Sequence, residues 1–292
     1  MGRSFIYVQM LKELRQNIEH GVSRMRMTAD TTGMADQLFQ DYVRPVIDHY
    51  VPIVSPLAEH YGCRLLRARK CIDQLPFTDI ADLLNPPIPT GRALGSNVTA
   101  ILYASSSMQT CLAETDPKIG DLLTVVGLDY TNIKDRLFWF VGQLASFSKS
   151  LEPSHYIADR KELHRTAYFP EEARHSFLFQ DALLNEVFSL FSSPNDGFAL
   201  SRLLIDAVQS KRTSSDELSG VVFLSTKDAP GVNFAIFGDA IQEIKTGQLN
   251  LVEIVDIDEY GFVAYKLLKN GSLHGDQITW RDVPAFGAVH SR

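Results

Sequence analysis

The 292-residue sequence has only three cysteines, and this scarcity excludes two kinds of site. Cys63, Cys71 and Cys111 are odd in number and form no Cys-x-x-Cys pair. A disulfide framework and a thiolate zinc site are therefore not expected, and the chain is predicted to work in a reducing cytoplasm. The histidines also form no pair at i and i+4 on helical sequence, so no metal site is predicted.

Long apolar runs and an excess of basic charge are missing as well. No apolar run approaches the ~20 residues of a membrane span, and charged residues interrupt the N-terminal sequence before a signal core forms. The formal net charge is −7, so a general electrostatic attraction to nucleic acid or to an anionic membrane is not expected. Hydrophobic residues make up 45% of the chain, which is enough to bury a sizeable core.

Several catalytic motifs are absent. The chain has no Gly-x-Gly-x-x-Gly sequence and no Walker loop, so neither a Rossmann site nor a P-loop is supported. No Gly-x-Ser-x-Gly elbow surrounds Ser225, so a hydrolase nucleophile is not expected there.

Residues 1–57 are predicted to form a helical N-terminal extension, because apolar residues recur there at helical spacing in two stripes. Asp30 is a candidate cap for the second helix. Pro45 is expected to interrupt that helix, and Pro52 and Pro56 to end it. The stripes are Met10, Leu14, Ile18 and Val22, followed by Met34, Leu38, Tyr42, Val46 and Tyr50.

Residues 58–282 are predicted to form one α+β domain, followed by a tail at 283–292. Short apolar runs bounded by turn residues favour strands. In a helical insertion, Pro170 opens a helix to about Phe191, and Asn195-Asp196-Gly197 starts another through Leu200, Leu204 and Val208. A helix is also expected over Ser106–Glu114, and turns at Gly247 and Tyr260–Gly261. The predicted strands are Arg64–Ala68, Ala100–Ala104, Leu122–Leu128, Val221–Leu224, Asn233–Phe237, Ile241–Lys245, Asn250–Asp256 and Phe262–Leu267.

A polar set stands out against these apolar segments. Arg92, Tyr103 and Glu114 follow one another at equal steps of eleven residues, bringing a cation, an aromatic ring and a carboxylate into one short segment. Such a set suits a phosphorylated ligand with a flat ring. Each residue also has a purely structural interpretation: a loop arginine, a core tyrosine and a surface glutamate at a helix end.

Two further positions have the same two interpretations. Arg67 and Arg69 share one face of a strand, where they predict either an anion site or a solvated face with salt bridges. Ser225 ends an apolar strand beside a loop, a position from which a hydroxyl can bind a ligand.

Together these positions resemble the RES domain, a family named for its Arg, Glu and Ser. The resemblance spans roughly Arg64 to Phe237. It consists of an arginine on an early strand, Gly91-Arg92, Tyr103 in the run Leu-Tyr-Ala-Ser, Glu114 in an Ala-Glu, Ser225 on a strand, and then Gly-x-Asn before an apolar strand. The family's first arginine falls on Arg67, with Arg69 as the alternative.

The resemblance implies an ADP-ribosyltransferase-like fold with a split mixed β-sheet and a helical insertion. It also implies an enzyme that consumes NAD⁺ by cleaving the nicotinamide–ribose bond, through phosphorolysis or hydrolysis. Many members are bacterial toxins held inactive by an Xre-type antitoxin. NAD⁺ is then the substrate, inorganic phosphate a co-substrate, and no resident cofactor is implied.

The resemblance also implies a role for each of these residues. Glu114 would stabilise positive charge on the ribose or orient its hydroxyls. Arg67 and Arg92 would hold the pyrophosphate or an incoming phosphate, Tyr103 would stack on nicotinamide or ribose, and Ser225 would hydrogen-bond the nicotinamide ribose.

Two alternatives stay open. The acceptor of ADP-ribose could be a protein side chain, as in a protein ADP-ribosyltransferase. The chain could also be a non-enzymatic subunit or interaction module of a toxin–antitoxin or defence assembly, with the helices of residues 1–57 docking a partner.

Overall fold

The structure is a computed structural model of an α+β protein whose strands are mixed but largely antiparallel. The predicted α+β class is therefore confirmed. Arg92 and the predicted cap at Asp30 lie outside the described residues, as does the tail from residue 284. The described residues are 2–25, 27, 31–58, 64–84, 101–150, 156–158, 161–164, 169–189, 199–210, 218–229 and 231–283.

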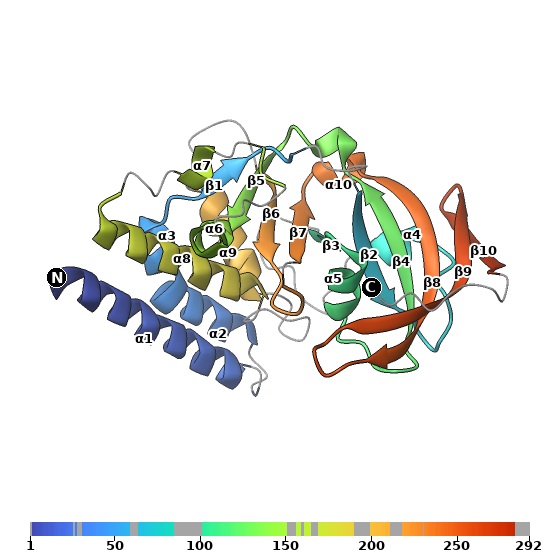
Figure 1. The fold of residues 1–292 in the computed structure, drawn as a ribbon, viewed down its shortest axis with the longest axis horizontal. Coiled ribbons are helices and arrows are strands. Elements are labelled where there is room, and N and C mark those ends of the chain that lie inside the picture. The colour runs from blue at the N-terminus through green and yellow to red at the C-terminus, as the bar shows by residue number, and fades with distance from the viewer. Residues whose placement is uncertain are drawn as a thin grey trace. The chain divides into compact units, whose positions relative to one another are not determined.

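The chain forms two compact units (Figure 1). Among the described residues, the first unit takes those within 1–58 and 135–224, and the second takes those within 59–88, 100–134 and 225–292. The helices of residues 1–57 thus share a unit with the helical insertion, and the chain first changes unit after Ala58. The division into 1–57, 58–282 and 283–292 rests on sequence pattern and stays a prediction.

The first helix, α1 (Gly2–Met25), buries one stripe of its surface. Ile18 and Val22 are buried, as their spacing predicts. Met10 is wrongly placed in that stripe, because its side chain is 44% exposed and the neighbouring Leu11 is buried instead. Met25 completes the buried face at the end of the helix.

Pro45 disturbs the second helical segment, as expected. Helix α2 (Thr31–Leu38) runs into a π-helical turn, η1 (Phe39–Val43), before α3 (Arg44–His49) begins with proline in its first turn. Proline has no N–H, and its ring crowds the carbonyl four residues earlier in an α-helix. The wider turn, in which the Arg44 N–H donates to the carbonyl of Phe39, accommodates it.

In its described residues, the remainder of the first unit combines three strands with four helices. The strand order is β1-β5-β6, with β1 and β5 antiparallel and β5 and β6 parallel. The predicted insertion helix is present as α8, and β1 and β5 were not predicted. The elements are β1 (Ile53–Ser55), β5 (Leu137–Val141), α6 (Gln143–Ser150), α7 (Lys161–His164), α8 (Glu171–Ser189), α9 (Ala199–Ser210) and β6 (Leu218–Leu224).

A buried carboxylate connects three helices of this unit. Asp181 on α8 accepts hydrogen bonds from the Tyr50 hydroxyl (2.6 Å) and from the backbone N–H groups of Gly142 and Ala145 (3.0 Å each). Burial raises the pKa of Asp181, although each of these donors lowers it. The carboxylate thereby satisfies donors at the start of α6 that would otherwise be buried without partners.

The second unit is built on an antiparallel sheet with strand order β7-β3-β2-β4-β8-β9-β10. Within the described part of this unit, four short helical segments accompany it. Its elements are β2 (Arg64–Lys70), α4 (Ile80–Leu84), β3 (Ile101–Ser105), α5 (Met108–Ala113), β4 (Leu122–Asp129), η3 (Thr131–Ile133), β7 (Val232–Phe237), α10 (Ala240–Glu243), β8 (Lys245–Ile257), β9 (Val263–His274) and β10 (Gln277–Asp282).

Two predictions for the C-terminal part are wrong. The strand expected at Ile241–Lys245 is the short helix α10, since Gly238, at a φ of +64°, turns the chain after β7. Gly247 lies within β8 rather than in a turn. A Cβ atom there would lie 3.5 Å from the carbonyl oxygen of Gly127, an ordinary van der Waals distance, so the space at this position does not require glycine. The turn at Tyr260–Gly261 is confirmed.

Two neighbouring strands of this sheet pair at a single position, which lies beside the candidate site. Strands β2 and β3 pair only at Leu66 and Ser105, whereas β2 pairs with β4 along its full length. Helix α5 covers this region, and its Leu112 belongs to an apolar cluster with side chains of β4 and β8.

Among the described helices, none is both long and apolar enough to cross a membrane.

Gly142→Ala is expected to lower the free energy of unfolding by about 2–4 kcal/mol. The residue has a φ of +76°, and a Cβ atom would lie 2.7 Å from the Asn185 Oδ1 atom. Gly120→Ala is the matched control, because Gly120 has a φ of +89° but no atom within 4 Å of the added Cβ. It should cost only about 1 kcal/mol. Equal losses in urea unfolding would contradict this account.

Candidate functional site

Glu114 occupies the C-cap of α5. The helix begins with Ser107, whose side chain accepts a hydrogen bond from the Thr110 N–H (3.0 Å). It ends where the Glu114 N–H donates to the Thr110 carbonyl (3.0 Å). The helix predicted at Ser106–Glu114 is thus present between its two caps, and the carboxylate projects from its last turn.

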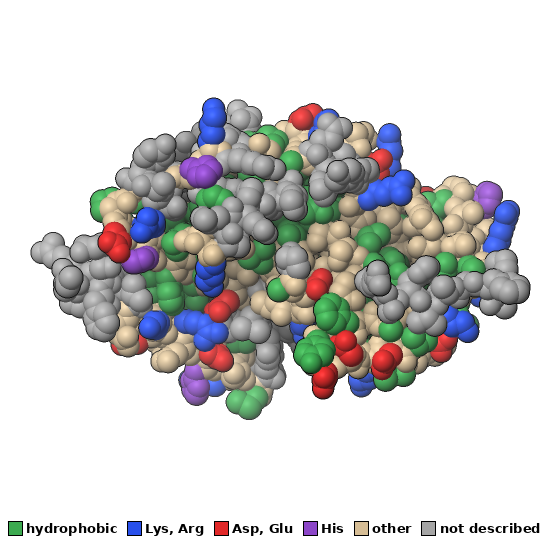
Figure 2. Space-filling model, viewed as in Figure 1, with side chains coloured by type: hydrophobic (Ala, Val, Ile, Leu, Met, Phe, Trp, Pro, Cys, Tyr) green, Lys and Arg blue, Asp and Glu red, His purple; other side chains and the backbone are tan. Residues whose placement is uncertain are grey.

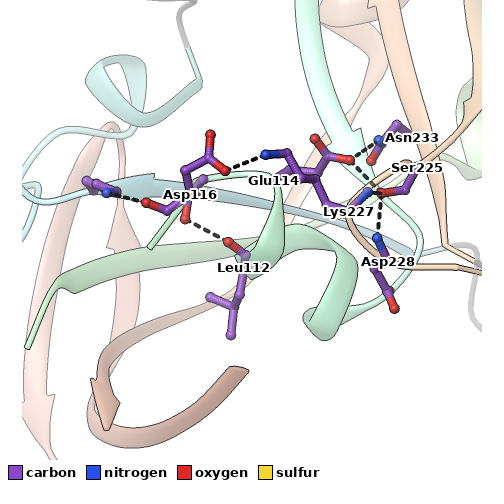
Figure 3. A network of polar contacts seen from close by, with 9 residues as sticks. Leu112, Glu114, Asp116, Ser225, Lys227, Asp228 and Asn233 are labelled. Atoms are coloured by element: carbon purple, nitrogen blue, oxygen red, sulfur yellow. Dashed lines mark hydrogen bonds and ion pairs between the residues drawn. The ribbon is translucent and has the colours of Figure 1, made fainter. Parts of the chain in front are cut away.

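The carboxylate of Glu114 is held by one of its two oxygens (Figure 3). Oε1 accepts a hydrogen bond from Ser225 Oγ and a second from Asn233 Nδ2, each at 2.6 Å. No group among the described residues donates to Oε2. The clamp therefore fixes the orientation of the carboxylate and leaves its second oxygen for another partner.

The Ser225 hydroxyl is fully used within this cluster. Its proton goes to Glu114, and its oxygen accepts from the backbone N–H groups of Lys227 and Asp228, at 3.1 Å each. A hydroxyl has one donor and two acceptor positions, so Ser225 has no position left for a ligand. The geometry therefore favours a positioning role for Ser225 over contact with substrate.

Asn233 is the second member of the clamp, and it lies outside the set of site residues predicted from the sequence. It is buried on β7, opposite Ser105 of β3. The Ser105 hydroxyl donates to Asn233 Oδ1 (2.7 Å), which turns the amide NH₂ towards Glu114. The signal for this residue was the Gly-x-Asn sequence after Ser225.

All donors in this chain of hydrogen bonds point towards Glu114. The carboxylate accepts the two hydrogen bonds that end this chain, both at Oε1. Both donors to it are neutral, and among the described residues Glu114 forms no ion pair. The negative charge is thus oriented without being neutralised.

A tight turn holds Ser225 against α5. The Ser225 N–H donates to the Gly231 carbonyl (2.9 Å), and Thr110 Oγ1 donates to Asp228 Oδ2 (2.6 Å). Gly231 approaches the helix so closely that a Cβ atom there would lie 2.4 Å from Thr110 Oγ1. Only glycine fits at this contact, so the turn and the helix are tightly connected.

Arg67 is buried beside the opening between β2 and β3. Its Nε donates to the Leu83 carbonyl and one of its terminal nitrogens to the Tyr103 carbonyl, at 2.8 Å each. Burial, and then the neighbouring Arg69, lower the pKa of Arg67 to about 10. Even so, the guanidinium stays charged at neutral pH, and it places a positive charge within the sheet.

Arg67 and Glu114 both act on one buried thiol. Burial raises the pKa of Cys111 to about 12, while the charge of Arg67 lowers it and that of Glu114 raises it. The predicted cation and the predicted carboxylate therefore both lie close enough to Cys111 to influence its pKa.

The Arg69 side chain contacts different groups from those that Arg67 contacts. It donates to the carbonyl of Asp82 and lies over the ring of Phe77, 5.4 Å from its centroid. Burial lowers its pKa. Of the two arginines left open by the sequence, Arg67 is the one joined to Tyr103, so the geometry favours Arg67.

The structure thus brings together four of the predicted residues in two bonded pairs, Glu114 with Ser225 and Arg67 with Tyr103. Arg92 lies outside the described residues. Within the described part of the chain, no group of three or more His, Cys, Asp or Glu side chains is placed to hold a metal ion. On the face shown in Figure 2, the basic side chains of the described residues are spread among acidic ones.

No protein-family model, curated protein or solved structure matches the chain.

The buried thiol of Cys111 makes the free energy of unfolding depend on pH. Its pKa of about 12 lies above the ~8.5 of an unfolded cysteine. Between pH 9 and 10 the folded protein therefore keeps a proton that the unfolded chain loses, and the unfolding free energy falls by about 1.4 kcal/mol per pH unit. Cys111→Ala should remove this slope.

Urea unfolding of both proteins across this pH range measures the difference. Arg67 is present in both, so its lowered pKa cancels in the comparison. Equal slopes would contradict the buried, protonated thiol.

Proposed function

We propose that this chain is an NAD⁺-consuming enzyme of the RES type, which cleaves the nicotinamide–ribose bond by phosphorolysis or hydrolysis. One observation carries the proposal: the Glu114 carboxylate is held at Oε1 by two neutral donors, and among the described residues Oε2 has none. A carboxylate oriented in this way stabilises positive charge that develops next to it.

The chemistry requires such a group. When the bond between C1′ of the ribose and the nicotinamide nitrogen breaks, its electron pair leaves with nicotinamide, which becomes neutral. The ribose gains oxocarbenium character, as in glycoside cleavage. An oxygen of phosphate or water then forms the new bond to C1′. Oε2 of Glu114 is suited to stabilise the cation or to accept a hydrogen bond from a ribose hydroxyl or from the nucleophile.

Arg67 and Tyr103 supply the complementary features. We assign Arg67, with Arg92, to the phosphates of NAD⁺, because a guanidinium matches phosphate oxygens bidentately. The Tyr103 ring is assigned to stack on nicotinamide or ribose. The single pairing between β2 and β3 supports a split sheet of the ADP-ribosyltransferase kind.

The proposal extends to the biological setting. NAD⁺ is the substrate and phosphate a co-substrate, so no resident cofactor is needed. We propose a cytoplasmic bacterial toxin controlled by an Xre-type antitoxin, on the basis of the five-position resemblance alone. A protein side chain as the acceptor would instead make the chain a protein ADP-ribosyltransferase, and mass spectrometry of treated cell proteins for an ADP-ribose adduct tests this.

Glu114→Gln is expected to lower nicotinamide release from NAD⁺ by about 100-fold or more. Glutamine keeps an oxygen that accepts from Ser225 and Asn233, so the fold should be unchanged and only the charge is lost. Glu259→Gln, on an exposed turn of the same unit, is the matched control. Release should be followed with and without phosphate. Absence of release from wild type under both conditions, or equal release from Glu114→Gln, would overturn the proposal.

Ser225→Ala and Asn233→Ala test the positioning role. Each should lower kcat by about 10-fold to 100-fold with little change in KM, because each loosens the carboxylate without touching substrate. Both act on one oxygen, so the double variant should lose less than the product of the single losses. Independent, multiplying losses would contradict a shared clamp. Loss of all activity in Ser225→Ala alone would indicate direct chemistry by the hydroxyl.

A further inference from the structure

A lysine lies on the same turn as Ser225 and forms an ion pair with an exposed carboxylate. Lys227 Nζ forms an ion pair with Asp116 Oδ1 at 2.6 Å. The Lys227 side chain is 45% exposed and that of Asp116 is 75% exposed. Ion pairs in such positions contribute little to stability because water screens them. The lysine can therefore exchange this carboxylate for another anion at small cost.

Two contacts fix the position of Lys227 relative to Glu114, one made by the lysine backbone and one by its side chain. Its backbone N–H donates to Ser225 Oγ, which itself donates to Glu114 Oε1. Its partner Asp116 follows Glu114 in the chain, and the three side chains lie together in Figure 3. A cation is thus held on the turn of Ser225, which donates to the carboxylate whose second oxygen has no donor among the described residues.

The Asp116 loop is anchored independently of Lys227. The ammonium group of Lys70, at the end of β2, donates to the Asp116 carbonyl (2.8 Å) and pairs with Asp121 (2.9 Å). Asp116 itself has a φ of +47°, in the left-handed region that aspartate tolerates better than most residues. The loop should therefore stay in place when Lys227 turns away from Asp116.

We propose that Lys227 is a phosphate-binding residue beside Glu114, and that Asp116 is the counter-ion which it releases when the phosphate group binds. The choice of ligand rests on the proposed function. The phosphate group is either that of the dinucleotide or the free phosphate that attacks C1′, and both present the same anionic oxygens to the ammonium group.

The test is direct binding of inorganic phosphate and of ADP-ribose, measured by isothermal titration calorimetry without NAD⁺. Lys227→Met should weaken binding of at least one of them about tenfold, since it removes a charged hydrogen bond. Lys227→Arg should retain binding. Asp116→Asn should tighten binding several-fold, because it removes the competing carboxylate. The two substitutions thus have opposite expected signs.

Lys269→Met is the matched control, because Lys269 forms an exposed ion pair with Asp282 elsewhere in the same unit. It should leave both affinities unchanged. Weakening of phosphate alone identifies a site for the nucleophile, and weakening of ADP-ribose alone identifies a site for the dinucleotide. Unchanged binding in Lys227→Met, or no binding of either ligand to wild type, overturns the proposal.

These outcomes separate this inference from the proposed enzyme activity. Cleavage of NAD⁺ whose phosphate dependence and KM are unchanged in Lys227→Met would overturn the role of Lys227 and retain the enzyme. Phosphate or ADP-ribose binding that depends on Lys227, in a protein that releases no nicotinamide, would retain the anion site and overturn the enzyme.

Discussion

The site depends on the two hydrogen bonds that Ser225 and Asn233 donate to one oxygen of Glu114. They join residues 111 and 119 positions apart in the chain. Because both donors are buried and neutral, they orient the carboxylate and leave its charge uncompensated. A lysine or arginine in the same place would orient it equally well but would neutralise the charge before any substrate arrived.

The surrounding structure is arranged to keep this clamp in place. Ser107 caps α5, so the helix ends with Glu114 at the right position. The close contact of Gly231 with Thr110 holds the Ser225 turn against the helix, and Ser105 fixes the amide of Asn233. In the proposed reaction, the carboxylate would need no reorganisation when charge develops in the transition state, because folding has already fixed its orientation.

The sequence predicted the α+β class and many of the strands. It also predicted Arg67, Tyr103, Glu114 and Ser225 as site residues, because each carries a functional group at a spacing that resembles a family, and their roles stay predictions. Asn233 belongs to the Gly-x-Asn sequence but was not assigned a role, because its contact with Glu114 depends on the pairing of β7 with β3 and on the hydrogen bond from Ser105. The strand at Leu137–Val141 was missed, since a short run of apolar residues shows no periodicity and lay beside helical sequence. The pairing of β2 with β3 at one position is set by tertiary contacts that no local pattern encodes.

In the proposed enzyme, Oε2 of Glu114 faces the ribose next to nicotinamide. A crystal structure of Glu114→Gln with NAD⁺ would show this, because the variant should bind the dinucleotide and cleave it slowly. We expect the nicotinamide ribose to lie within hydrogen-bonding distance of the side-chain nitrogen of residue 114, with Ser225 and Asn233 still bonded to its oxygen. NAD⁺ bound away from residue 114, or a ribose that contacts Ser225 while residue 114 points elsewhere, would contradict it.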